Sequence, residues 1–263
     1  RIFKVLQMPD GSSTVIIQGK KPFQLGECVQ SNPYFKASVL PYEHTVLPVK
    51  DEKFDAPMSP YFDDSEITWS TDGKKIAYTC KKMSGKDYAV STDSDIYLYD
   101  LETKSTTNLT EGMLGYDKYP VFSPDSKYLA WTSMETPGYE ADKERLFIMN
   151  LETKEKEYLT EHFDYGASNV VWPQVEGNYD NLYFISCFQA THQIFKINYK
   201  TREVVQITEG DHDITSIKWN GNGFVAEKMS IKSATEIFTF DQYGKETQIT
   251  FTNKHIYDNI AVS

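Results

Sequence analysis

Side chains able to do covalent chemistry are present, but they are widely scattered along this sequence. The string YGASNV at 165–170 contains a serine, yet it has one Gly too few for the G-x-S-x-G turn that exposes a nucleophile. Ser168 is therefore predicted to be an ordinary polar loop residue. The G-x-x-x-x-G-K-[ST] pattern of a phosphate-binding loop is absent, which argues against nucleotide hydrolysis. We expect no catalytic residue in this chain.

Metal-ligating side chains are equally dispersed. The three cysteines form no CxxC pair, and the five histidines are far apart in the sequence. The segment DHD at 211–213 has the side chains to hold a cation, but a solvated loop between strands is the favoured interpretation. We expect neither a metal nor a cofactor.

Composition limits the class of partner. The chain has 263 residues, 40% hydrophobic and 14% aromatic, and a net charge of -11. This acidity disfavours nucleic acid, whose phosphates require clustered Lys and Arg. No run approaches the roughly 18 apolar residues of a membrane span, and the N-terminus lacks the apolar stretch of a signal peptide. Because the chain begins with Arg1, we expect it to be a piece of a longer polypeptide.

The elements that position these side chains are set by a repeat. The segments YDLETK (99–104) and MNLETK (149–154) are nearly identical, and each is followed by a Leu-Thr pair. Leu-Thr or Ile-Thr pairs begin at 109, 159, 207 and 249, so the spacings are 50, 48 and 42 residues. Repeats of this length are typical of four-stranded propeller blades. We predict an all-β fold with about four blades, over residues 62–112, 117–162, 168–210 and 214–253.

Each unit has the alternation and the turns of four strands. Segments such as DIYLYDL (95–101) and RLFIMNL (145–151) are rich in aromatic and β-branched residues. Strings such as STDG and SPDS between apolar runs indicate hairpin turns. A β-sandwich is the rival architecture, but the repeated turn motifs and Leu-Thr pairs favour a partial propeller that forms an open arc. Residues at one shared place in successive blades are expected to pack between blades: Trp69, Phe122, Trp172 and Trp219.

The blade region, residues 55–263, resembles a known family. FSPDSKYLAW, SDIYLYDLETK and above all SMETPGYEADKERLFIMNLETKE are similar to the propeller of prolyl-oligopeptidase-family (S9) serine peptidases, in particular the dipeptidyl and acylaminoacyl peptidases. The resemblance implies a propeller of seven or eight blades over an α/β-hydrolase domain with a Ser, Asp and His triad. This chain lacks the G-x-S-x-G motif, so we expect it not to cleave peptides itself.

The resemblance also suggests a substrate-binding site. Dipeptidyl peptidases of this family hold the free ammonium of a peptide with propeller carboxylates, and GYEADKER is the matching stretch. Glu140 is the candidate anchor, and Asp142 and Arg145 are predicted to orient it. The alternative is a solvated, salt-bridged loop tip without a ligand, and the chain lacks a tandem acidic pair.

The first fifty residues do not belong to the repeat. The hairpin VLQMPDGSSTVIIQG and the segments PFQLGECV and YFKASVLPY resemble part of the N-terminal, substrate-recruiting domain of Lon ATP-dependent proteases. We predict two separate units, 1–54 and 55–263. A composite or a fusion is favoured over an accidental resemblance, because both matches are continuous and both break at the same place.

Three hypotheses for function follow from these resemblances. The first is a non-catalytic recognition and gating propeller that orients peptides for an absent hydrolase domain. The second is a Lon-type module that binds exposed apolar segments of damaged proteins, and the third is a propeller scaffold for protein partners. The localisation is split in the same way, because the propeller family is often exported to the periplasm, whereas Lon proteases are cytoplasmic.

Overall fold

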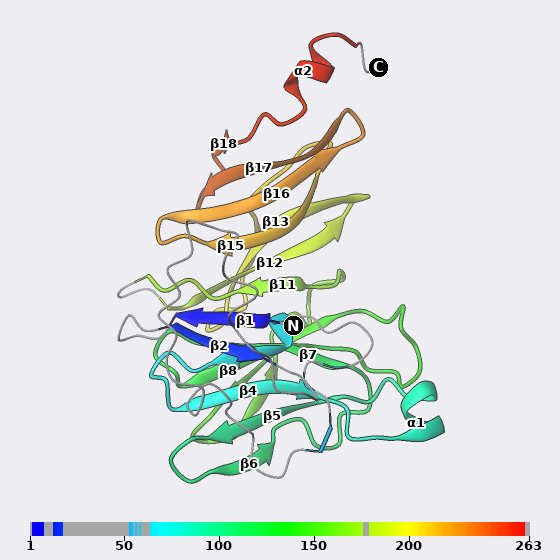
Figure 1. Ribbon diagram of the computed structural model, residues 1–263, viewed down its shortest axis with the longest axis vertical. Helices are drawn as coiled ribbons and strands as arrows, with labels where there is room; N and C mark the ends of the chain where they lie inside the picture. Colours follow the sequence, from blue (N-terminus) through cyan, green and yellow to red (C-terminus); the bar gives the residue numbers. More distant parts are fainter. Residues whose placement is uncertain are drawn as a thin grey trace, which may run out of the picture.

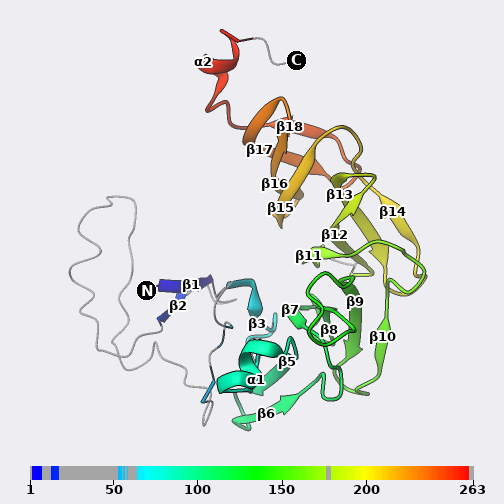
Figure 2. The same ribbon diagram turned by 90° about the vertical axis from the view of Figure 1, so that its right-hand side faces the viewer.

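The predicted fold class is confirmed by the computed structural model, which describes residues 2–7, 13–17, 53–54, 56, 58, 64–175 and 179–260. Four antiparallel sheets of four strands follow one another along the chain, and Figure 2 shows them arranged as an open arc. Blade 1 contains β3 (Ile67–Trp69), β4 (Lys75–Cys80), β5 (Asp95–Asp100) and β6 (Ser105–Asn108). Blade 2 contains β7 (Asp117–Phe122), β8 (Tyr128–Ser133), β9 (Arg145–Asn150) and β10 (Lys156–Tyr158).

The second half of the arc has the same order of strands. Blade 3 contains β11 (Ser168–Val171), β12 (Asn181–Phe188), β13 (Thr191–Asn198) and β14 (Val204–Gln206). Blade 4 contains β15 (Asp213–Trp219), β16 (Gly223–Ser230), β17 (Ser233–Asp241) and β18 (Glu246–Gln248). The short helical elements are η3 (Asp64–Glu66), α1 (Gly85–Val90) and α2 (Lys254–Tyr257).

Before the blades, β1 (Ile2–Gln7) and β2 (Ser13–Ile17) form a two-stranded antiparallel sheet, as the hairpin prediction requires. The two further extended segments, 22–29 and 34–42, lie outside the described residues. Phe54 and Ala56 pack against the outer side of blade 1. The separation into units 1–54 and 55–263 remains a prediction.

The core of the molecule lies in the seams between neighbouring blades. Leu98, Leu129 and Trp131 belong to the cluster between blades 1 and 2, and Leu146 and Phe184 to the cluster between blades 2 and 3. A third cluster joins blades 3 and 4. The four aromatic residues expected between blades all belong to or pack against these clusters or the cluster on the outer side of blade 1. Each fully buried Leu or Phe contributes about 1.5–3 kcal/mol relative to an exposed one, so the seams provide the main stabilisation.

The repeated six residues form the turn between the third and fourth strands of a blade. Asp100 Oδ1 accepts hydrogen bonds from the N–H groups of Glu102 (3.0 Å) and Thr103 (2.9 Å), and Lys104 then adopts a φ of 56°. The other three blades place an Asn or Asp at the same position and a residue of positive φ after it: Asn150 and Lys154, Asn198 and Arg202, Asp241 and Gly244. A side chain that bonds its own backbone and a left-handed residue together reverse the strand.

The Leu-Thr pair closes each blade. The hydroxyl oxygens of Thr110, Thr160, Thr208 and Thr250 accept the backbone N–H of Ile96, Leu146, Ile194 and Ile237, at 2.8–3.0 Å. The segment that directly follows the fourth strand is thereby tied to the third strand. The sequence echo is thus explained by local hydrogen bonding that every blade repeats.

Candidate functional site

The blades differ in the length of the connection from the second to the third strand. We call the end that carries the connections from the second to the third strand the loop face. These connections span 81–94 in blade 1 and 134–144 in blade 2, but only 189–190 in blade 3 and 231–232 in blade 4. In Figure 1 the loop face is on the right, where α1 projects from the first connection. The predicted site residues Glu140 and Asp142 lie in the second of these long connections.

The blade-1 connection is held by a buried lysine. Lys81 Nζ donates to the carbonyl oxygen of Tyr88 at 2.6 Å and to that of Ser91, and it lies 4.4 Å from the centroid of the Tyr88 ring. Burial lowers the pKa of Lys81, and the negative charge of Glu140 opposes that shift. The cation therefore fixes α1 to the blade and is within electrostatic range of the neighbouring loop.

The blade-2 connection, residues 134–144, is closed by Asp142. Its carboxylate accepts the N–H of Glu135 (3.0 Å) and Thr136 (2.7 Å) across the loop, and the N–H of Lys143 (2.8 Å). The hydrogen bond from Thr136 is the largest cause of a pKa below the usual range for Asp142. Asp142 is therefore ionised at neutral pH and shapes the loop.

The two connections contact each other. The N–H of Gly138 donates to Thr92 Oγ1 at 2.7 Å, which joins the blade-2 loop to the blade-1 loop. At the base of the loop, a Cβ on Gly115 would lie only 2.3 Å from the carbonyl oxygen of Met134, so this close approach requires glycine. The loop is thus positioned by contacts from both blades.

Glu140 lies on the exposed side of this loop. Its Oε1 accepts a hydrogen bond from the hydroxyl of Tyr116 at 3.3 Å, and the ring of Tyr116 lies 3.6 Å from Lys118 Nζ. An exposed carboxylate with one neutral donor has lone pairs available for a cation. This arrangement can accept charge-assisted hydrogen bonds from an ammonium group.

Arg145 lies at the end of the loop and points to other partners. Its Nη1 pairs with Glu135 at 3.2 Å, and its Nε and Nη2 donate to the carbonyl and hydroxyl oxygens of Ser133, each at 3.4 Å. The guanidinium packs on the rings of Phe147 and Tyr158. The structure therefore brings the three predicted residues into one region, but Asp142 and Arg145 contact the loop backbone and Glu135 rather than Glu140.

Two carboxyl groups at the loop, one buried and one half-buried, were not predicted from the sequence. Asp117 accepts a hydrogen bond from Trp131 Nε1 at 2.8 Å, and its Oδ2 has no partner among the described residues. Burial raises the pKa of Asp117 to about 7. Burial also raises the pKa of Glu144, and the charge of Lys118 opposes that shift. A buried Asp has no local sequence signal, because its burial depends on the neighbouring blade.

Ser168 and the DHD segment show no catalytic or metal-binding arrangement. Ser168 begins β11 and donates to the carbonyl oxygen of Ile185 at 3.2 Å, so the prediction of a loop was wrong because this residue pairs with β12. Asp213 begins β15, and its Oδ1 accepts from the backbone N–H (2.9 Å) and Nδ1 (2.8 Å) of His192. The part of the chain that the structure describes contains no group of three His, Cys, Asp or Glu that could hold a metal.

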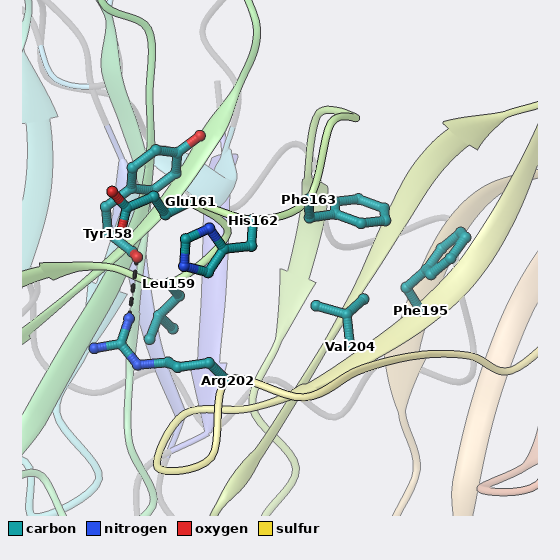
Figure 3. A pocket seen from close by; sticks show the side chains of 8 residues that line it. All are labelled: Tyr158, Leu159, Glu161, His162, Phe163, Phe195, Arg202 and Val204. Atoms are coloured by element: carbon teal, nitrogen blue, oxygen red, sulfur yellow. Dashed lines mark hydrogen bonds between the residues drawn. The ribbon is translucent and has the colours of Figure 1, made fainter.

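A groove of about 550 Å³ lies on the outer side of the seam between blades 2 and 3 (Figure 3). It is lined by Tyr158, Leu159, Glu161, His162, Phe163, Phe195, Arg202 and Val204. A groove of about 400 Å³ occupies the equivalent place between blades 3 and 4, where Ile207, Glu209 and Glu246 replace Leu159, Glu161 and Val204. We interpret both grooves as a feature of the repeat rather than a dedicated site.

Among the described residues, no helix is long and apolar enough to cross a membrane.

Comparisons with known proteins identify relatives of the blade region. The chain is 37% identical over 215 residues to dipeptidyl-peptidase 5 of Porphyromonas gingivalis, which covers 81% of this chain and 31% of that protein. It is 44% identical over 207 residues to dipeptidyl-peptidase 5 of Porphyromonas endodontalis, which covers 78% of this chain and 30% of that protein. The predicted resemblance to the propeller of these peptidases is confirmed. The chain spans about a third of the length of these relatives, and no family model matches it.

The Lon resemblance is also found, over a shorter stretch. Lon protease of Parabacteroides distasonis is 45% identical over 58 residues, which are 22% of this chain and 7% of that protein. Among solved structures, the acylaminoacyl peptidase of Pyrococcus horikoshii aligns with a TM-score of 0.53 at 16% identity, over 74% of this chain and 28% of that one. An oligogalacturonate lyase in complex with manganese aligns with a TM-score of 0.54 at 13% identity, over 69% of this chain and 51% of that one. Such structural similarity shows the fold alone, because propellers support unrelated chemistries.

Proposed function

We propose that the four blades are a non-catalytic part of a serine dipeptidyl peptidase, and that they recognise peptides for an α/β-hydrolase domain outside these 263 residues. The similarity to dipeptidyl-peptidase 5 supports this class of protein. The blade-2 connection gives the proposal a site. Glu140 anchors the free α-ammonium of the peptide, and the loop face is where the peptide binds.

The observation that carries the proposal is the construction of the loop around Glu140. A solvated tip needs no internal bracing, whereas this loop is closed by Asp142, joined to Thr92 and tied down by Arg145. The carboxylate of Glu140 remains exposed on it and has the Tyr116 hydroxyl as donor. A fixed carboxylate loses less conformational freedom on binding, so it suits recognition of a cation.

Binding of a free-amine tetrapeptide and its N-acetylated form, measured by calorimetry on the full chain, tests the anchor. A hydrogen bond to a charged group stabilises by about 1.5–3 kcal/mol, so we expect the free-amine peptide to bind about tenfold more tightly or better. Glu140→Gln should abolish that difference. Glu152→Gln, an equal change of charge in the blade-2 turn, is the matched control and should preserve it.

Two outcomes would reject parts of the proposal. Equal binding of the two peptides would discard Glu140 as the anchor. Absence of binding to either peptide would discard peptide recognition by this chain and favour a scaffold for protein partners.

The similarity to Lon protease supports a second candidate, a substrate-recruiting role for the N-terminal stretch. In that case the chain would bind unfolded polypeptides through exposed apolar segments. Binding of a reduced, unfolded protein that persists in the Glu140→Gln variant would favour this second function.

A further inference from the structure

One position has the same hydrogen-bonding role in three of the four blades. In each blade the Thr hydroxyl of the Leu-Thr or Ile-Thr pair accepts a backbone N–H. The position is that of the residue directly before the one that donates this N–H. Asp95 accepts the hydroxyl proton of Thr110 (2.8 Å), Gln193 accepts that of Thr208 (2.8 Å), and Glu236 accepts that of Thr250. A side-chain oxygen at this position therefore completes the closure of the blade.

Blade 2 departs from this rule, because Arg145 occupies the position. A guanidinium has only donors, so it cannot accept the hydroxyl proton of Thr160. Thr160 still accepts the N–H of Leu146 at 3.0 Å, but no side-chain oxygen among the described residues accepts its own proton. The side chain of Arg145 is turned instead toward Ser133, the last residue of β8, and toward Glu135, near the start of the loop.

We propose that Arg145 is a positioning residue that holds the 134–144 loop, and with it Glu140, through Glu135. This inference rests on the proposed function for its effect on peptides, whereas its effect on the loop does not. Glu135 is next to Thr136, and the N–H groups of both residues donate to Asp142. The ion pair therefore fixes one end of the segment that Asp142 closes.

The surroundings of Arg145 favour positioning over direct contact with the peptide. Its side chain is only 15% exposed, and Cζ of the guanidinium lies 5.3 Å from the centroid of the Phe147 ring and 5.7 Å from that of the Tyr158 ring. Such packing orders the cation more than an ordinary surface pair would. A cation would also repel the ammonium that Glu140 is proposed to bind. Arg145 thus acts on the carboxylate loop and not on the ligand.

Arg145→Gln distinguishes an effect on the loop from an effect on the stability of the fold, because Gln is the residue that blade 3 has at this position. The new amide can accept the Thr160 proton, so we expect the midpoint of thermal unfolding to stay equal or rise by a few degrees. Without the ion pair, hydrogen exchange of the Thr136 and Gly138 amides should become about tenfold faster. The affinity for the free-amine peptide should fall about tenfold.

Two further variants control for a general structural effect. Arg145→Glu combined with Glu135→Arg reverses the ion pair and should restore slow exchange at Thr136 and Gly138, with at least part of the affinity. Arg202→Gln removes the other described arginine, which pairs with Glu157 and donates to the Tyr158 carbonyl oxygen at 3.0 Å in the seam between blades 2 and 3. It should change neither loop exchange nor peptide affinity.

The outcomes distinguish this inference from the proposed function. Unchanged amide exchange in Arg145→Gln, or faster exchange that the reversed pair fails to restore, overturns the positioning role. Faster exchange with rescue, in a chain that binds no peptide, supports the positioning role and rejects the proposed function. Weaker peptide binding by Arg145→Gln, with unchanged amide exchange in the loop, would also overturn the inference, because Arg145 would then contact the peptide itself.

Discussion

Blades 1 and 2 differ from blades 3 and 4 at the loop face, although all four have the same strands. The first pair have connections of 14 and 11 residues, 81–94 and 134–144, which contact each other. The second pair turn in two residues, and in blade 3 both of these, Gln189 and Ala190, have positive φ, as tight hairpins require. Residues that keep the repeat therefore build the blade, and departures from the repeat build the candidate site.

The buried seams between blades should not show this difference between the two pairs of blades, because the seams are equivalent along the whole arc. Leu146 between blades 2 and 3 and Ile194 between blades 3 and 4 are both fully buried. Leu146→Ala and Ile194→Ala should each lower the free energy of unfolding by about 2–5 kcal/mol, since a buried aliphatic side chain is replaced by a cavity. Denaturant titration followed by fluorescence measures both.

Val225→Ser, on the partly exposed side of blade 4, is the control for these two variants and should change stability by less than about 0.5 kcal/mol. A loss confined to one of the two buried variants would show that the blades do not share one cooperative core.

Asp117 gives blade 2 a titratable group that blade 3 lacks at the same position, because the equivalent residue in blade 3 is the apolar Ala167. Its pKa is about 7 in the folded protein against an ordinary value of 3.8 for an Asp side chain, so the folded state binds the proton more tightly than the unfolded chain. Stability from this group is complete below pH 3.8 and is lost as the pH rises to about 7. At 1.36 kcal/mol per pKa unit, the loss is at most about 4 kcal/mol.

Asp117→Asn keeps an acceptor for Trp131 Nε1 and removes the titration. Its unfolding free energy should therefore stay flat between pH 4 and 7 relative to that of the unmodified chain, which falls over this range. Parallel pH profiles for the two proteins would contradict a protonated Asp117. Asp125→Asn, in an exposed turn, serves as the control for removal of a carboxylate.

The sequence predicted what is local and missed what depends on neighbouring blades. The turn at Asp100 and Lys104 is encoded within six residues, so its echo along the chain predicted the blades and their order. The candidate loop was found through Glu140, but the Glu135 partner of Arg145 and the Thr92 partner of Gly138 were not. These contacts join residues 10 and 46 positions apart, and no periodic pattern marks them.

The smallest predicted effect concerns the hydroxyl groups that close blades 2 and 3. The hydroxyl of Thr208 both accepts and donates a hydrogen bond, whereas that of Thr160 only accepts one within the part of the chain that the structure describes. Thr208→Val should therefore destabilise the protein by about 1 kcal/mol more than Thr160→Val, because it also leaves the buried Gln193 amide without one partner. Thermal and denaturant unfolding of the two variants measure the difference.

The same pair of variants can be made in a chain that carries Arg145→Gln. There an acceptor faces Thr160 as Gln193 faces Thr208, so the cost of Thr160→Val should rise to match that of Thr208→Val. The coupling energy between positions 145 and 160 from this double-mutant cycle should be about 1 kcal/mol. A coupling energy near zero would show that something other than Arg145 leaves the Thr160 hydroxyl without an acceptor. The departure from the repeat at position 145 would then have no link to the loop.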